Sequence, residues 1–519
     1  MNQATGATGR AMMGQTATPA PLSFRRALLA MLGLSLTLML SALDQTVIGN
    51  TMPYIVADLG GFDLYAWLAT GYLLTSIVTV PIFGRLGDYF GRKYFVVAAT
   101  LLFTLSSLLC AQAGSMLMLV VWRALQGVGG GMLIGTAFAC IPELFPDMRR
   151  RLRWQILLST AFSIVNALGP TLGGVLTEHY GWRAVFYLNV PCGLAALVIS
   201  WRYLPYFKPS QRQGIRLDWL GALLVMALLG CLQLGVTGLS TRMNTLGVIA
   251  LLSASALALL ALIGQQKRAV SPLLPPALFA PGTLRQLFIL STLAGGVMFT
   301  LLYFTPLLFQ GGYGYSAQQA ALLLTPMGVS ITVGAIINGR IVTRLRNPVL
   351  LPTCGFLLLA AACLGLALCG AEGGFRRLLL LMLMAGVGLG FILLNLTIFT
   401  QTLAPGEHLG IATALLQSFR LVGGLLGTAA TSLLFNTLYH ALLRRTTSES
   451  AWLRWADPGK LLGMTAQGSS GEMMAARHAL INAVDVGLAA CAAIALIAAG
   501  ITWRLSTIVL VSSPGSRAA

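Results

Sequence analysis

Long apolar runs recur along the whole chain, with short polar segments between them. Each run has about 20 residues, enough for a helix to cross the roughly 30 Å hydrocarbon core of a bilayer. We count about fourteen such runs. They lie near 27–53, 64–83, 94–113, 116–140, 154–176, 184–204, 219–239, 246–262, 287–309, 320–337, 349–369, 378–399, 411–438 and 484–501. The pattern predicts an all-α integral membrane protein surrounded by membrane lipid.

Composition and charge agree with this class. The chain is 57% hydrophobic and 9% charged, which excludes a soluble protein. Its net charge of +19 would suit a nucleic-acid binder, but the basic residues are spread over many short loops and form no single patch. With both termini cytoplasmic, about 22 Lys and Arg residues fall inside and about nine outside. The charge therefore indicates membrane orientation, and no nucleic-acid partner is predicted.

An internal repeat divides the chain. The segment beginning Gly339-Arg340 resembles the one beginning Gly84-Arg85, and each follows a predicted span. In this alignment Arg123 corresponds to Met382, so ionisable residues are concentrated in the first half. Two six-span halves of this kind are typical of secondary transporters. The predicted divisions are a disordered cytoplasmic tail (1–24), a six-helix bundle (25–205), a linker with two extra spans (206–284), a second six-helix bundle (285–507) and a cytoplasmic tail (508–519).

The second bundle contains the longest predicted extramembrane stretch, an outer loop over 440–482. Trp452, Trp455 and Leu461 in this loop indicate a partly ordered element at the membrane interface.

A glycine-rich, charged segment joins the second and third spans. Its notable residues are Gly84, Arg85, Gly87, Asp88, Gly91, Arg92 and Lys93. The glycines permit a sharp turn and a close approach of the helix ends. The charges form a cluster to which a neighbouring helix end could bind, and we call this the latch. The simpler alternative is that Arg and Lys only mark the cytoplasmic face, but it leaves the glycine spacing and Asp88 unexplained.

Four ionisable residues fall inside predicted spans: Asp44, Arg123, Arg420 and Asp485. Burial of such groups is costly, so they usually serve an ion or substrate path. Counted from the outer ends of their helices, Asp44 lies about 16 Å deep and Arg123 about 10 Å deep, so the two are expected to meet near the midplane. Burial favours a neutral carboxylic acid, whereas a nearby guanidinium favours the carboxylate. We therefore predict that Asp44 carries a proton and Arg123 tunes it; the alternative is a permanent salt bridge.

The other two ionisable residues have less defined roles. Arg420 lies about 14 Å inside the thirteenth span, where it either attracts an anionic group and balances Asp44 or binds carbonyls of adjacent helices. Asp485 is expected near the outer end of the last span, half solvated, as a subsidiary proton site.

A proline and three glycines mark the fifth span: Gly169, Pro170, Gly173 and Gly174. Proline kinks a helix, and small residues allow close helix packing. A tight contact between the two halves at this face would resist leakage; ordinary packing without a gating role is the alternative. Candidate substrate contacts, for each of which helix packing is the simpler interpretation, are Tyr303, Phe304, Gln310, Asn395, Gln401 and Gln417.

Enzyme chemistry finds no support in the sequence. The eight cysteines form no C-x-x-C pair and the four histidines lack metal-ligand spacing, so neither a disulfide framework nor a metal site is expected. There is no H-E-x-x-H, G-x-x-x-x-G-K-[ST] or G-x-S-x-G motif. We therefore expect no enzyme, no direct ATP drive and no cofactor other than the proton as coupling ion.

The chain resembles the major facilitator superfamily, and within it is most similar to the fourteen-span drug:proton antiporter branch (EmrB/QacA type). The motifs that carry the resemblance lie at 43–53, 84–93, 123–129, 166–174, 272–279 and 417–424. Gly49 is a departure, since the branch often has Asn or a small apolar residue there. The resemblance implies two six-helix bundles plus two linker helices, fourteen transmembrane helices in all.

The resemblance also implies a function. It indicates a proton-coupled antiporter that exports lipophilic or amphipathic drugs by alternating access across a bacterial cytoplasmic membrane. The fifth-span motif is associated with antiporters and argues against import. A dedicated exporter of an endogenous metabolite or lipid is the alternative. The chain is expected to be a monomer, and a periplasmic adaptor is left open as a partner.

Overall fold

The computed structural model describes residues 24–145, 154, 165, 168–206, 218–240, 244–269, 272, 274, 278–342, 345, 347–370, 373–404, 409–462 and 471–505. Every regular element in these ranges is a helix, as the sequence predicted. Thirteen of the described helices are long and apolar enough to cross a membrane. The fifth predicted run falls largely outside the described residues, so the count of fourteen stays a prediction. The same holds for the two tails and the domain boundaries.

Apolar sequence gives long helices, five of which contain an internal proline of the kind that membrane-spanning helices tolerate. The first half contains α1 (Phe24–Leu59), α2 (Tyr65–Phe90), α3 (Arg92–Ala111), α4 (Met116–Leu144), a helix described over 168–180, and α6 (Arg183–Tyr203). Next come α7 (Trp219–Ser240) and α8 (Thr245–Arg268). The second half contains α9 (Gly282–Leu307), α10 (Ala317–Ile341), α11 (Leu350–Ala367), α12 (Phe375–Leu403), α13 (Leu409–Thr446) and α15 (Gly471–Trp503). Shorter elements are η1 (Phe62–Leu64), the π-helix η3 (Leu308–Gly312), α14 (Glu449–Trp455) and η6 (Pro458–Leu461).

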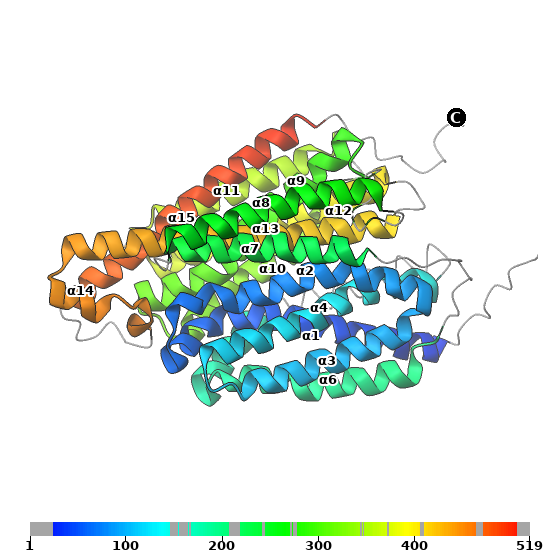
Figure 1. Cartoon of the computed structure of the whole chain (residues 1–519), viewed down its shortest axis with the longest axis horizontal. Helices are drawn as coiled ribbons and strands as arrows, with labels where there is room; N and C mark the ends of the chain where they lie inside the picture. The colour runs from blue at the N-terminus through cyan, green and yellow to red at the C-terminus, as the bar shows by residue number, and fades with distance from the viewer. Residues whose placement is uncertain are drawn as a thin grey trace, which may run out of the picture.

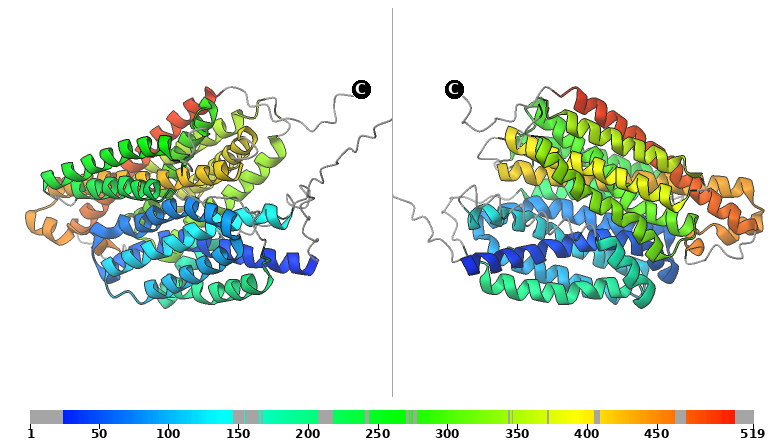
Figure 2. Two further views of the ribbon diagram at one scale, coloured as in Figure 1. Left: turned by 45° about the vertical axis from the view of Figure 1, so that its right-hand side comes forward. Right: turned by 180° about the vertical axis from the view of Figure 1, so that it is seen from behind.

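The two halves lie on opposite sides of the molecule and use the same helix pairings (Figures 1 and 2). In the first half α2 packs on α4, α3 on α4 and α6, and α1 on α6. In the second half α10 packs on α12, α11 on α12 and α15, and α9 on α15. The halves meet where α1 contacts α9 and α2 contacts α13, while α7 and α8 pair with each other and α7 lies against α13 and α2. This agrees with the repeat seen in the sequence.

The turn between α2 and α3 consists of a single residue. Gly91 has φ +85°, a value that suits glycine, and its N–H donates to the carbonyl of Gly87 at 3.0 Å. Gly84 and Gly87 therefore belong to α2 and not to the predicted loop. Gly84 faces the Gly135 carbonyl of α4, and the Arg92 side chain covers Gly87. The side chains of Arg85 and Asp88 lie outside the described residues, so the latch stays a prediction.

The segment predicted as an outer loop, 440–482, is largely helical where it is described. It extends α13 to Thr446, forms α14 and η6, and begins α15 at Gly471. Trp455 and Leu461 are buried against protein, and the Tyr439 hydroxyl donates to the Trp455 carbonyl at 2.8 Å. These side chains thus pack into a small core at the ends of α13 and α15, which Figure 1 shows projecting from the molecule. We call this the α14 end and the opposite one the Gly91 end.

Candidate functional site

A buried ion pair joins α1 to α4 in the middle of the first half. Arg123 Nη1 donates to Asp44 Oδ2 at 2.6 Å, and the two side chains are 0% and 1% exposed. Asp44 lies about 22 Å along α1 from Leu59 at 1.5 Å per residue, well inside the helix. The structure therefore brings together the two residues that the sequence expected to meet.

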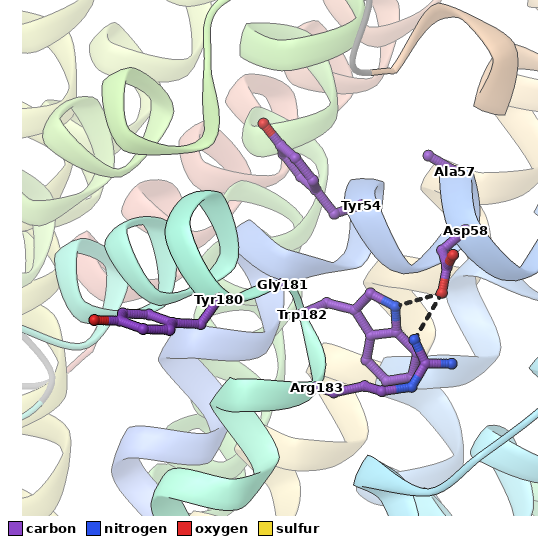
Figure 3. A pocket seen from close by; sticks show the side chains of 7 residues that line it. All are labelled: Tyr54, Ala57, Asp58, Tyr180, Gly181, Trp182 and Arg183. Carbon is purple, nitrogen blue, oxygen red and sulfur yellow. Dashed lines mark hydrogen bonds and ion pairs between the residues drawn. The ribbon is translucent and has the colours of Figure 1, made fainter.

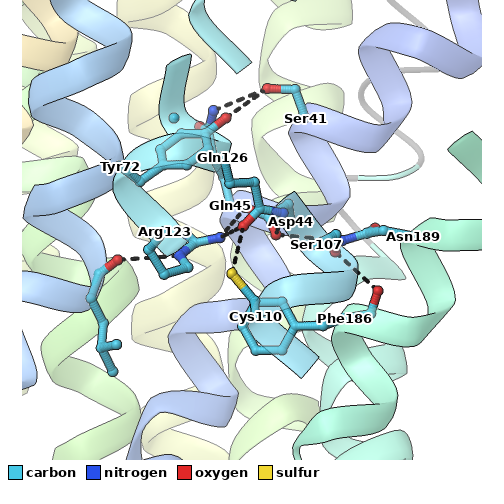
Figure 4. A network of polar contacts seen from close by, with 12 residues as sticks. Ser41, Asp44, Gln45, Tyr72, Ser107, Cys110, Arg123, Gln126, Phe186 and Asn189 are labelled. Carbon is cyan, nitrogen blue, oxygen red and sulfur yellow. Dashed lines mark hydrogen bonds and ion pairs between the residues drawn. The ribbon is translucent and has the colours of Figure 1, made fainter. Parts of the chain in front are cut away.

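Two amides complete the surroundings of Asp44 (Figure 4). Gln126 Nε2 donates to Asp44 Oδ1 at 2.9 Å, and Gln126 Oε1 accepts from Arg123 Nη1 at 2.6 Å. Asn189, on α6, donates to Ser107 Oγ at 3.0 Å and lies 3.5 Å from Asp44 Oδ1. Sequence reasoning assigned no role to either amide. Gln126 could have been predicted from its spacing, since it lies one helical turn after Arg123. No feature of the sequence indicated Asn189.

Arg123 also contacts α2. Its Nε donates to the Leu68 carbonyl at 3.3 Å, and the guanidinium carbon lies 4.8 Å from the centre of the Tyr72 ring. The Tyr72 hydroxyl in turn hydrogen-bonds Ser41 Oγ of α1 at 3.1 Å. Arg123 Nη2, by contrast, is buried and has no hydrogen-bond partner among the described residues. Its guanidinium therefore has bonding capacity that this arrangement does not use.

Glycines on α4 allow α2 to lie close enough for these contacts. A Cβ at Gly127 would lie 2.3 Å from the Tyr72 carbonyl oxygen, and one at Gly130 would lie 2.1 Å from the Tyr72 hydroxyl. A Cβ at Gly131 would lie 2.7 Å from the Ser76 carbonyl oxygen. Any larger residue would move α2 and lift Tyr72 away from Arg123. The glycine run after Arg123 thus shapes the site.

Tyr303 brings the second half to this site. It lies on α9, is 1% exposed, and lies within electrostatic range of both Asp44 and Arg123. Its carbonyl accepts from the Tyr65 hydroxyl of α2 at 3.0 Å. Its own hydroxyl is buried and has no hydrogen-bond partner in the described part of the chain. Of the predicted substrate contacts, Tyr303 is thus the one placed beside the ion pair.

The remaining predicted substrate contacts lie elsewhere. Asn395 is buried and donates to Asn338 Oδ1 at 3.0 Å and to the Phe391 carbonyl at 2.8 Å, so it ties α12 to α10. Gln417 is half-buried on α13. Phe304 and Gln310 are buried, and Gln401 is half-buried.

Arg420 and Asp485 do not join the Asp44–Arg123 network. Arg420 is half-buried on α13, its carbonyl oxygen packs against Gly295 of α9, and its Nε has no hydrogen-bond partner among the described residues. Asp485 was predicted near the outer end of its span, but α15 begins at Gly471, which places Asp485 about 21 Å along the helix at 1.5 Å per residue. Its Oδ1 is buried without a hydrogen-bond partner in the described ranges.

The glycines of the fifth span pack within the first half. A Cβ at Gly169 would lie 2.0 Å from Thr46 Oγ1, and one at Gly173 would lie 2.6 Å from Val47 Cγ1, so both face α1. Pro170 and Gly174 are buried in the same helix. Gly169 and Gly173 therefore contact α1 within the same half, and the gating role of this face stays a prediction.

Polar contacts between the halves gather toward the α14 end. Thr171 hydrogen-bonds Thr325 of α10. Gln318 N–H donates to Glu178 Oε2 at 3.0 Å, and Ala317 N–H donates to the Tyr54 hydroxyl at 3.3 Å. All three contacts join the first nine residues of α10 to α1 or to the helix over 168–180. The ends of these helices are therefore held together on this side of the ion pair.

A separate pocket opens at the α14 end between α1 and α6 (Figure 3). Asp58 Oδ2 accepts from Trp182 Nε1 and from Arg183 Nη1, both at 2.9 Å. These hydrogen bonds lower the pKa of Asp58 below its ordinary value. The Asp58 and Arg183 side chains are 50% and 43% exposed, so this is a surface clamp distinct from the buried pair. In the described ranges no three His, Cys, Asp or Glu side chains lie together as a metal site would require.

Comparison with known proteins gives a consistent picture. The Major Facilitator Superfamily model matches residues 34–428. Multidrug transporter protein MdtP of Bacillus subtilis (strain 168) is 32% identical over 400 residues, covering 76% of this chain and 73% of that protein. Multidrug resistance protein 3 of the same organism is 32% identical over 419 residues, covering 79% and 81%. The tetracenomycin C resistance and export protein of Streptomyces glaucescens is 30% identical over 413 residues, covering 78% and 75%.

Solved structures share the fold. An inward-facing, unoccupied bacterial homolog of the human lysosomal transporter Spinster superposes with a TM-score of 0.66 at 16% identity, covering 93% of this chain and 98% of that one. A D-xylose-proton symporter superposes with a TM-score of 0.57 at 15% identity, again covering 93% and 98%.

Proposed function

The chain belongs to the major facilitator superfamily, and we propose that it is a proton-coupled antiporter that exports lipophilic or amphipathic drugs by alternating access. Relatives named as multidrug transporters support drug export. The sealed Asp44–Arg123 pair is the observation that supports proton coupling. We further propose a bacterial cytoplasmic membrane as the location, and a monomer that works alone or with a periplasmic adaptor.

The energetics of the pair explain how a proton could drive transport. Removing the charge of one partner from a buried ion pair leaves the other charge unbalanced, at a cost of about 3–5 kcal/mol. Protonation of Asp44 would do this to Arg123, which is fully buried. The protein must then rearrange, or the proton must leave. A site of this kind links proton binding to a change of conformation, as an antiporter requires.

The contacts at the α14 end support alternating access. Tyr54, Thr171 and Glu178 of the first half contact the beginning of α10, while Tyr65 contacts the Tyr303 carbonyl. We propose that these contacts close the outer side and separate when substrate is released there. Asp485 and Arg420 remain candidates for a second proton site and for a charge that balances Asp44.

Purified protein in liposomes tests the proposal. An inside-acid proton gradient is imposed, and uptake of a lipophilic fluorescent cation is followed for the wild type and Asp44→Asn. We expect gradient-dependent uptake that the substitution abolishes. Asp58→Asn, which neutralises the surface carboxylate instead, is the matched control and should transport normally. Unchanged gradient-driven uptake by Asp44→Asn would rule out Asp44 as the proton carrier.

A dedicated exporter of an endogenous metabolite is the second candidate. It is favoured by the similarity to the tetracenomycin C resistance and export protein, whose name indicates one dedicated compound. The same liposomes distinguish the two, because a dedicated carrier would transport no member of a broad panel of lipophilic drugs.

A further inference from the structure

We propose that Tyr303 couples protonation of Asp44 to the second half. When Asp44 is protonated, the Tyr303 hydroxyl becomes the alternative hydrogen-bond partner of Arg123. This inference rests on the proposed function and assigns a coupling role to a residue outside the ion pair. Tyr303 acts here as a positioning residue, since it works through Arg123.

The backbone around Tyr303 holds it firmly at the junction of the halves. Its carbonyl accepts the hydrogen bond from Tyr65 of α2, and its ring stacks on Phe299 with centroids 5.9 Å apart. Toward α1, the Tyr303 Cδ1 atom would lie 3.4 Å from a Cβ placed on Gly49, five residues after Asp44. Tyr303 thus contacts the helix that carries Asp44 and the helix that carries Tyr72.

Three polar atoms near the ion pair have no hydrogen-bond partner among the described residues, and one of them, Asn189 Oδ1, belongs to the same half as Arg123. The Tyr303 hydroxyl and Arg123 Nη2 are both buried and both lack a hydrogen-bond partner among the described residues. Buried polar groups are nearly always hydrogen-bonded, so unpaired ones require an explanation. Arg123 Nη2 is an N–H donor and the Tyr303 hydroxyl can accept, and the two side chains lie within electrostatic range of each other. They are complementary, and they come from opposite halves.

Protonation of Asp44 supplies the reason for them to pair. When Asp44 takes up a proton, Arg123 stays charged but loses its balancing carboxylate. An additional acceptor then stabilises the guanidinium, since hydrogen bonds to charged groups are the stronger ones. The Tyr303 hydroxyl is the acceptor that the second half offers. Forming this bond would draw Arg123 toward α9 and change the contact between the halves.

Other groups face the pair among the residues that the structure describes. The titratable ones are Tyr72 of α2, Cys110 of α3 and Tyr303 of α9. The Tyr72 hydroxyl already bonds Ser41, and Cys110 Sγ lies 3.7 Å from Gln126 Oε1. Among the described residues of α6, Asn189 and Phe186 face the pair and do not ionise, and the unpaired Asn189 Oδ1 is an acceptor within the first half itself.

The test removes the Tyr303 hydroxyl and keeps the ring. In Tyr303→Phe we expect gradient-driven uptake in liposomes to fall by about tenfold or more, the effect of losing a hydrogen bond to a charged group. Gradient-free exchange of substrate should persist. The pH of half-maximal driven transport should also fall, by about one pH unit, because the protonated state loses a stabilising bond. A residue that only fills space would not move this pH.

A matched control is Tyr439→Phe, which removes another buried hydroxyl of the second half, one that bonds Trp455. It should leave the driven transport and its pH profile unchanged. If Tyr303→Phe proves unstable, 3-fluorotyrosine at position 303 weakens the hydroxyl as an acceptor without deleting it. The pH of half-maximal transport should then move in the same direction by a smaller amount.

The outcomes separate this inference from the proposed function. Loss of driven transport in Asp44→Asn together with a wild-type pH profile in Tyr303→Phe and in the fluorotyrosine protein would overturn the role of Tyr303 alone. Retained driven transport in Asp44→Asn would overturn the proposed function, and the inference with it.

Discussion

The backbone carbonyl of Leu302 lies so close to Gly49 that a Cβ on this glycine would be 2.6 Å from the oxygen. This contact joins α1 to α9 and therefore joins the two halves. It also explains why glycine suits position 49. The backbone oxygen cannot move aside as the end of a flexible side chain can.

Gly49→Ala should therefore disturb the contact between the halves. Overpacking of this kind typically costs about 1–3 kcal/mol, which outweighs a gain of about 1 kcal/mol in helix propensity. We expect a lower melting temperature and slower drug uptake in liposomes. Gly264→Ala in α8 is the control, because a Cβ there would meet nothing within 4 Å. Equal melting temperatures for the two variants would contradict this assignment.

Gln126 should set the pH range of transport. Its amide donates to the Asp44 carboxylate at 2.9 Å and so favours the charged form. In Gln126→Leu we expect the pH of half-maximal transport to rise, with a loss of about 1–3 kcal/mol in stability from the unpaired groups left behind. Transport measured from pH 5 to 9 gives the profile. Gln265→Leu, in which a glutamine that bonds Asp218 is lost instead, should leave the profile in place.

If the bond between Asp44 and Arg123 were a permanent salt bridge, substitutions of the pair would have a different effect on transport than if Asp44 carries a proton. Arg123→Gln alone should destabilise the fold by about 3–5 kcal/mol, because the Asp44 charge stays buried without its partner. Adding Asp44→Asn should restore much of that stability, since the two effects are not additive for residues in contact. We expect the double variant to fold yet show no gradient-driven uptake. Normal driven uptake by the double variant would instead identify a purely structural bridge.

The surface clamp at Asp58 should be insensitive to pH in the working range. Its pKa is lowered from 3.8 in the folded state by the bonds from Trp182 and Arg183. Its contribution is therefore fully present above the unfolded value and is lost only as pH falls through the lower folded value. Because the pair is half exposed, Asp58→Asn should cost at most about 1 kcal/mol. Melting temperatures at pH 7 and pH 5 should show the same small difference from the wild type, and a difference that vanished by pH 5 would contradict the assignment.

The positions of the helices were predictable because a membrane span must be apolar along its whole length. Each span therefore corresponds to a continuous apolar run in the sequence. The meeting of Asp44 and Arg123 was predictable from their depths along two helices. The role of Asn189 was not, because it lies 145 residues from Asp44 and only the packing of α6 brings it near. The helix against which Gly169 and Gly173 pack was likewise not predictable. Small residues indicate close helix packing, but they do not specify the neighbouring helix.

The stretch 440–482 shows the same limit in another form. Its polar and charged residues suggested a loop, but Tyr439, Trp455 and Leu461 find partners in one another and in the ends of α13 and α15. Local sequence does not contain that information. Helices continued beyond the predicted span because these side chains offered a surface to pack on.

The repeated helix pairings give the transporter two bodies of the same plan but unequal chemistry. The first body contains the buried ion pair, whereas the position that corresponds to Arg123 in the second is the fully buried Met382. The proposed protonation of Asp44 would therefore change the internal energy of the first body directly and would reach the second body through contacts such as that between Tyr65 and Tyr303. The two bodies would then contribute unequally to the conformational change, although they share one plan of helix pairings.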